Sequence, residues 1–147
     1  MITELKGDII KLALNGHFDV IVHGCNCFHT MNSGLAKQIK DTFLDAYIAD
    51  KSTSYGKESK LGTCSFAECG DLVIVNLYSQ FRYGKGSKVD YDALRKGLYW
   101  VEKSFEIDRI GIPHIGCGLA HGDWNIVKKI IDETIGNLDV TIVEYDK

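Results

Sequence analysis

Three consecutive apolar residues, Val20, Ile21 and Val22, are the feature that most restricts how this chain can fold. Successive side chains of a β-strand point to opposite faces, so an uninterrupted apolar run needs apolar surroundings on both sides. Strands of this kind lie inside a sheet that helices cover on both faces. The sequence therefore predicts a central strand at residues 20–23.

Segments with strand and helix patterns alternate along the rest of the chain. Strands are predicted at residues 1–6, 20–23, 61–69, 72–78, 109–113 and 140–143, and helices at residues 9–14, 34–48, 91–105 and 125–135. Gly70-Asp71 predicts a hairpin between two of the strands, and Ser33 is expected to cap the helix that begins at Gly34. This order predicts an α/β fold whose ligands bind at the carboxyl ends of the central strands.

Length and composition fit one compact domain over residues 1–147, with 45% hydrophobic and 25% charged residues. The formal charge of −3 argues against a broad basic surface, so general nucleic-acid binding is not expected and an anionic ligand has to be held locally. Every apolar run is shorter than the roughly 18 residues of a membrane helix. We therefore expect a cytoplasmic monomer with no membrane partner.

The chain has five cysteines, an odd number, and residues 1–8 lack the pattern of a signal peptide. Both features predict a reducing, cytosolic setting. The spacings Cys25-x-Cys27 and Cys64-x4-Cys69 do not match a structural zinc site, and no arginine follows Cys117 to support a thiol phosphatase. We expect small packed thiols, no metal and no cofactor.

Two loops rich in glycine and polar residues stand at the predicted binding edge. Residues 116–122 read Gly-Cys-Gly-Leu-Ala-His-Gly before a helix, so their backbone N–H groups could hold an anion. A tight turn that needs glycine explains this loop equally well when it is taken alone. Residues 24–33 add an amide, a histidine and hydroxyl groups between a strand and a helix.

The order of these motifs along the chain resembles the macro-domain family. The matching segments are Gly7-Asp8-Ile9, then Val22-His23-Gly24-Cys25-Asn26-Cys27 and Ser33-Gly34-Leu35-Ala36, then Pro113-His114-Ile115-Gly116-Cys117-Gly118-Leu119. The resemblance covers essentially the whole chain. It implies a three-layer fold, with a central mixed β-sheet between helices, that binds ADP-ribose or a derivative of it.

The resemblance also implies a role for each part of the ligand site. Asp8 would accept a hydrogen bond from the adenine amino group beside the Ile9 backbone, although a helix cap is the alternative for Asp8. Asn26 would lie against the distal ribose. The pyrophosphate would be held from two sides by the backbones of Ser33, Gly34 and Leu35 and of Gly116, Cys117, Gly118, Leu119, Ala120, His121 and Gly122.

Within the family the chain looks most similar to the branch with the ADP-ribose-1''-phosphate phosphatase and the terminal ADP-ribose protein glycohydrolase, together with phage and bacterial relatives. It departs from the glycohydrolase pattern at two places. Gln80 stands at or near the position of a lysine, and Ala120 stands where that branch has an aspartate, with Asp123 three residues later. These departures argue against glycohydrolysis that depends on the lysine.

Phosphatase action on ADP-ribose-1''-phosphate is the activity predicted from these residues. It needs a positioned water, a proton donor and stabilising N–H groups. Asp123 is predicted to orient or deprotonate the water and His23 or His121 to donate the proton, with Asn26 beside them at the distal ribose. The alternatives are an N-cap for Asp123, a buried structural histidine for His23 and a solvated loop residue for His121.

Two other functions remain open from the sequence. The pocket could bind ADP-ribose without turnover, as a reader of ADP-ribosylated macromolecules, or it could hydrolyse ADP-ribosyl or O-acetyl-ADP-ribose linkages. An aromatic cluster of Tyr78, Phe81 and Tyr83 could stack on the ligand or pack in the core. His17 and His114 receive no role.

Overall fold

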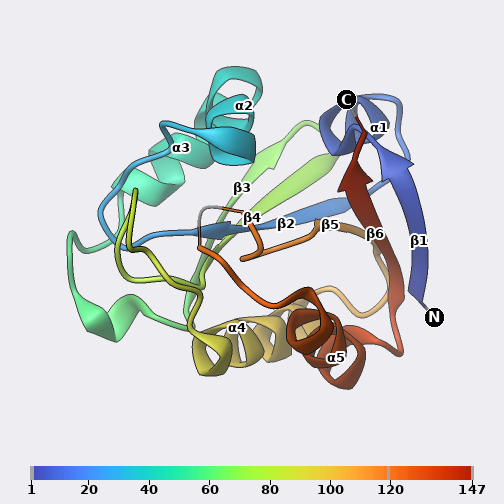
Figure 1. The fold of residues 1–147 in the computed structure, drawn as a ribbon. Coiled ribbons are helices and arrows are strands. Elements are labelled where there is room, and N and C mark those ends of the chain that lie inside the picture. The colour runs from blue at the N-terminus through green and yellow to red at the C-terminus, as the bar shows by residue number, and fades with distance from the viewer. Residues whose placement is uncertain (1, 119, 147) are drawn as a thin grey trace.

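The computed structural model describes residues 2–118 and 120–146, and its strands form one sheet in the order β1-β6-β5-β2-β4-β3 (Figure 1). The strands are β1 (Ile2–Gly7), β2 (Val20–Cys25), β3 (Cys64–Cys69), β4 (Leu72–Tyr78), β5 (Arg109–Pro113) and β6 (Asp139–Tyr145). The helices are α1 (Ile9–Leu14), α2 (Gly34–Thr42), α3 (Leu44–Lys51), α4 (Tyr91–Ser104) and α5 (Trp124–Ile135), with a short 3-10 helix η1 (Glu58–Lys60).

Most of the sheet is parallel. β1 pairs with β6, β6 with β5, β5 with β2 and β2 with β4 in parallel, and only the edge strand β3 runs antiparallel, to β4. This arrangement confirms the predicted mixed sheet and the hairpin at Gly70-Asp71. Because five neighbouring strands share one direction, their carboxyl ends lie along a single edge.

Helices cover both faces of the sheet, with α4 and α5 on one face and α1, α2 and α3 on the other (Figure 1). Val20 and Val22 belong to the core cluster that contains the buried residues of α4 and α5. Ile21 belongs to the cluster that contains those of α1, α2 and α3. The apolar run of β2 is therefore buried on both sides, as its pattern predicts, and the three-layer α/β fold is confirmed.

The helix predicted at residues 34–48 is wrong as a single element. Phe43 ends α2 and precedes α3 with non-helical angles, φ −128° and ψ 75°. The break turns the axis so that α3 lies on β3 and buries Ala46, while Leu44 and Ile48 are exposed by 60% and 52%. The apolar spacing continues across the break, so a single helix would direct Leu44 and Ile48 to the core. In the structure both side chains face solvent.

Strand β3 begins three residues later than predicted. The N–H of Thr63 donates to the carbonyl of Lys60 at 2.9 Å, and Gly62 has a φ of +81° that favours glycine. This turn occupies the first three residues of the predicted strand.

Within the described residues, every helix is too short or too polar to cross a membrane.

Candidate functional site

A cavity of about 630 Å³ lies at the carboxyl edge of the sheet. It is lined by residues that end or follow all five parallel strands. These are Gly7, Asp8 and Ile9 after β1, His23, Gly24, Cys25 and Asn26 around the end of β2, Gln80, Tyr83 and Gly84 after β4, Pro113 to Gly118 and Ala120 around the end of β5, and Val143 and Tyr145 on β6. Thr30, Asn32 and residues 33–36 and 38 complete the wall.

The loop after β5 is built around two glycines. The N–H of Gly122 donates to the carbonyl of Gly116 at 2.7 Å, and Gly116 has a φ of +75°. A Cβ on Gly122 would lie 2.5 Å from that carbonyl oxygen, so the closure requires glycine. The N–H groups of Gly116 and Gly118 donate to no acceptor among the described residues, and both glycines line the cavity. Such unpaired N–H groups can bind an anion.

A second anion-binding feature lines the cavity at the start of α2. Ser33 is the N-cap, yet its side chain makes no capping hydrogen bond. The N–H groups of Gly34 and Leu35 belong to the first turn, where an α-helix offers them no backbone partner. Because these residues line the cavity, their N–H groups and the positive end of the helix dipole are available to an anionic ligand.

Asp8 caps a helix and also lines the cavity. Its Oδ1 accepts hydrogen bonds from the N–H groups of Ile10 at 3.0 Å and Lys11 at 3.2 Å. The cap that the sequence offered as the alternative for Asp8 is therefore present. The carboxylate is half-buried at one end of the cavity, where its other oxygen has no hydrogen-bond partner among the described residues.

The amide of Asn26 shapes the loop after β2. Its Nδ2 donates to the carbonyl and hydroxyl oxygens of Thr30 at 3.1 and 2.7 Å, and its Oδ1 accepts from the N–H of Phe28 at 2.8 Å. Asn26 and Thr30 both line the cavity. The asparagine thus fixes the wall at the end of β2.

His23 is buried, with 1% of its surface exposed, and its Nε2 lies 2.7 Å from the Oδ1 of Asn76. Burial is the main cause that lowers the pKa of His23, to about 4, and the hydrogen bond to Asn76 partly offsets it. The imidazole is therefore neutral at pH 7. The alternative prediction for His23 is a buried structural histidine whose ring nitrogens bond to the backbone. The histidine is buried, but the partner of its Nε2 is the side chain of Asn76.

Several of the predicted catalytic and ligand-binding residues do not line the cavity. Asp123, His121 and Gly122 do not line it, and Leu119 lies outside the described residues. The Oδ1 of Asp123 accepts from the N–H of Asn125 at 2.9 Å, so this exposed carboxylate caps α5. His121 is exposed and has a φ of +55°. The acid-base roles of Asp123, His121 and His23 stay predictions.

All five cysteines are free, and burial raises the pKa of each thiol above its ordinary value. For Cys117 the negative charge of Asp123 adds to this effect. Thiols with raised pKa values are poor nucleophiles at pH 7. Among the described residues no group of three or more histidine, cysteine, aspartate or glutamate side chains could hold a metal ion.

Several cavity residues were not identified from the sequence. Thr30, Gln38, His114 and Tyr145 line the wall, and the ring of His114 stacks on Trp124 with 3.7 Å between centroids. His114 directly follows the last residue of β5, which is a position that could have identified it. Of the aromatic cluster, Tyr83 lines the cavity, whereas Tyr78 is buried and donates its hydroxyl to Asp50 at 2.7 Å.

No family model matches the chain. The fold is shared with solved macrodomains: the macrodomain of Mycobacterium tuberculosis DarG is 23% identical with a TM-score of 0.77, over 100% of this chain and 98% of that one. The structure of Thermosipho africanus DarTG in complex with ADP-ribose is 17% identical with a TM-score of 0.74, over 98% of this chain and 41% of that one. These likenesses define the class of fold.

Sequence relatives agree with the fold. A DNA ADP-ribosyl glycohydrolase of Mycobacterium tuberculosis is 26% identical over 99% of this chain and 42% of its own length. The chain belongs to the macro-domain family. A relative from Enterobacteria phage T4, an uncharacterized 17.5 kDa protein of the tk-vs intergenic region, is 35% identical over 99% of this chain and 97% of its own length. The chain thus spans nearly all of the phage protein and less than half of the glycohydrolase.

Proposed function

We propose that the cavity binds ADP-ribose and that the protein hydrolyses the bond between ADP-ribose and another molecule. The observation that carries the binding proposal is the presence of two anion-binding features in the wall of one cavity. The first turn of α2 and the loop at Gly116 and Gly118 both present backbone N–H groups to it. Two sets of N–H donors in one cavity can each bind one phosphate of a pyrophosphate.

The charge of the lining supports a ligand held by neutral donors. None of the described residues that line the cavity is a lysine or an arginine. An anion in this cavity must therefore be stabilised by N–H groups and the dipole of α2. Because a chain with a net charge of −3 has no broad basic surface to attract an anion, such local donors are what would hold the ligand.

Once the pyrophosphate is placed at these N–H groups, the positions of adenine and the distal ribose follow. Adenine would lie at the end of the cavity with Asp8 and Ile9, where the unpaired carboxylate oxygen can accept from an amino group. The distal ribose would lie toward Gly24, Asn26 and Gln80, at the ends of β2 and β4. The bond to be broken would be at the anomeric carbon of this ribose.

Hydrolysis of an ADP-ribosyl linkage has more support than phosphate release. Two relatives carry the name DNA ADP-ribosyl glycohydrolase. Phosphate release needs an acid and a base at the distal phosphate, but His23 is neutral and Asp123 and His121 do not line the cavity. In the proposed reaction water supplies a hydroxyl group to the anomeric carbon, and the leaving group takes the proton.

Calorimetry tests the binding step with a matched pair of variants. Gly118 has no described neighbour within 4 Å of the position of a Cβ, so a side chain can begin there without a clash, and Gly118→Glu is compared with Gly118→Gln. They add side chains of similar size that differ by one negative charge. Wild type should bind ADP-ribose and bind AMP weakly, and Gly118→Glu should lose far more affinity than Gly118→Gln. Equal affinities for ADP-ribose and AMP would contradict the proposal.

An assay panel tests the reaction. The purified protein is given an ADP-ribosylated oligonucleotide, ADP-ribosylated protein, O-acetyl-ADP-ribose and ADP-ribose-1''-phosphate, with Gly118→Glu as the control that lacks binding. Release of ADP-ribose from one of the first three supports the proposed hydrolase. Turnover of ADP-ribose-1''-phosphate alone would support the phosphatase predicted from the sequence. Binding without any turnover would make the protein a reader.

A further inference from the structure

Four aromatic rings gather beside the cavity and form what we call the aromatic platform: Phe28, Tyr55, Phe81 and Tyr83. Phe28 is its centre, with ring centroids 5.0 Å from Phe81, 5.4 Å from Tyr55 and 5.8 Å from Tyr83. The outer rings are open to solvent, since Tyr55 is 64% and Tyr83 55% exposed. A group of large exposed rings in contact is more typical of a binding surface than of a core.

Core residues and a tight turn hold the platform in place. Phe28 and Phe81 are half-buried and pack on the small core cluster of Cys25, Cys27, Met31 and Tyr78. Gly56 has a φ of +65°, and a Cβ there would lie 3.0 Å from the Phe28 ring, so the segment that carries Tyr55 is pressed against Phe28. Tyr55 therefore rests on a packed base, and Tyr83 contacts the same Phe28 ring.

The platform adjoins the distal end of the cavity. Tyr83 lines the cavity itself, and so do Gln80 and Gly84 of the same segment. The N–H of Phe28 donates to the side chain of Asn26, which also lines it. A molecule attached to the distal ribose would leave the cavity across these rings.

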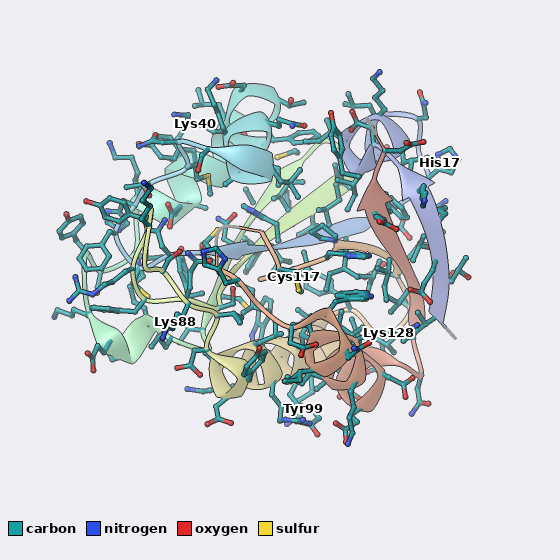
Figure 2. The ribbon with its side chains drawn as sticks, in the orientation of Figure 1. His17, Lys40, Lys88, Tyr99, Cys117 and Lys128 are labelled. Carbon is teal, nitrogen blue, oxygen red and sulfur yellow. The ribbon has the colours of Figure 1, made fainter. Side chains whose placement is uncertain are left out.

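Basic residues lie close to the platform residues in the sequence, and Arg82 contacts the Phe81 ring, although the chain is acidic overall. Residues 80–89 contain Arg82, Lys85 and Lys88 and no acidic residue, and Lys57 follows the turn at Gly56. All four side chains are exposed, and none forms an ion pair in the part of the chain that the structure describes. Figure 2 shows Lys88 on this segment, at the left of the view.

We propose that the aromatic platform binds single-stranded nucleic acid that flanks an ADP-ribosylated base in the cavity. Unpaired bases can stack on exposed rings, and flanking lysines and arginines neutralise the phosphates. A duplex cannot offer its base faces in this way. The inference rests on the proposed function, because the platform is useful to catalysis only if the modified base enters the cavity.

The test measures the anisotropy of a short fluorescent oligothymidylate, without ADP-ribose, as protein is added. The double variant Tyr55→Ala/Lys57→Ala removes one ring and one charge, and neither residue lines the cavity. The matched control Tyr99→Ala/Lys103→Ala removes the same groups from α4, where Figure 2 shows Tyr99 at the bottom of the view. ADP-ribose affinity is measured for every protein by calorimetry.

The platform variant should bind the oligonucleotide about tenfold more weakly or worse, since a base stack is worth about 1–3 kcal/mol. The α4 control should match wild type, and Tyr55→Phe should retain most of the affinity. Each lysine removed from the platform should reduce the slope of log affinity against log salt by about 0.7. ADP-ribose affinity should be the same in all of them.

Equal oligonucleotide affinity for the platform variant and the α4 control would overturn the inference. Equal competition by a duplex or by an acidic peptide would also overturn it, because either result would indicate binding by charge alone. If ADP-ribose binds while the oligonucleotide does not, the platform inference fails and the proposed function survives. If ADP-ribose itself does not bind, the proposed function fails.

Discussion

His23 donates its Nε2 hydrogen to the Oδ1 of Asn76, 2.7 Å away on the neighbouring strand. The direction of this bond follows from the other contacts of Asn76, whose Nδ2 lies 2.9 Å from the carbonyl oxygen of Ala46 and can only donate to it. The amide oxygen is left to accept. His23 is therefore held as one neutral tautomer in the wall of the cavity, with Nδ1 unprotonated.

The free energy of unfolding should rise with pH because of His23. The unfolded chain binds a proton on this side chain below its ordinary pKa of 6.5, whereas the folded protein excludes that proton until about pH 4. Between these values folding releases a proton, so stability should rise by at most about 1.4 kcal/mol per pH unit and by about 3 kcal/mol in total. Urea unfolding at several pH values measures this slope.

His23→Gln removes the titrating group and keeps an N–H donor for Asn76. The part of the pH slope that belongs to His23 should disappear in this variant. His17→Gln is the matched control, since His17 is exposed, as Figure 2 shows at the right of the view. An unchanged slope in His23→Gln would show that the folded protein can protonate His23.

Glycine is required at one position of the loop after β5 and not at another. Gly122→Ala places a Cβ 2.5 Å from the carbonyl oxygen of Gly116, so we expect a loss of about 1–3 kcal/mol in unfolding free energy. Gly118→Ala meets no atom within 4 Å and should stay within about 0.5 kcal/mol of wild type. Thermal and urea unfolding compare the two. Equal losses would mean that the loop can move away from Gly122.

Much of the fold could be predicted from local patterns. The uninterrupted run at Val20, Ile21 and Val22 predicted a strand covered on both faces, and the glycine loops predicted where the chain turns at the carboxyl edge. These features depend on neighbouring residues, so the sequence contains them directly. The break at Phe43 could not be predicted in this way, because the apolar spacing continues through it. The packing of α3 on β3 decides where the helix breaks.

The site was harder to predict where partners are distant in sequence. The tautomer of His23 is set by Asn76, which is 53 residues away and looks like any polar residue within an apolar strand, and its neutral state comes from burial. Tyr55 and Phe28 come together only because the chain returns at Gly56. In the sequence Asp123 follows an anion-binding loop, but in the structure its carboxylate accepts a hydrogen bond from the first turn of α5.

Asp8 should contribute to ADP-ribose affinity apart from its capping role. Asp8→Asn keeps a capping oxygen for Ile10 and Lys11, because asparagine caps about as well as aspartate. It replaces the other carboxylate oxygen with an amino group that cannot accept from adenine. Affinity should fall by about 1–3 kcal/mol with little change in stability. Asp71→Asn, on the exposed β3–β4 turn, is the control, and unchanged affinity in Asp8→Asn would remove Asp8 from the site.

Asp123 gives the sharpest test of the catalytic residues predicted from the sequence. A general base for phosphate release has to reach water at the distal phosphate, but this exposed carboxylate caps α5 and does not line the cavity. Asp123→Asn preserves the cap, so stability should hardly change. We expect turnover of the substrate identified in the assay panel to stay within about twofold of wild type. Asp123→Ala should retain turnover but lose about 1 kcal/mol of stability with the cap.

The opposite result would assign Asp123 to catalysis. If Asp123→Asn lowers turnover by about 100-fold or more while ADP-ribose affinity is unchanged, the carboxylate stabilises the transition state and the loop at residues 118–123 must rearrange when substrate binds. His121→Gln would then be measured next, since His121 would move into the cavity with the same loop. If both variants keep their turnover, other polar residues of the cavity wall must position the attacking water, and Gln80, after β4, is the first to replace.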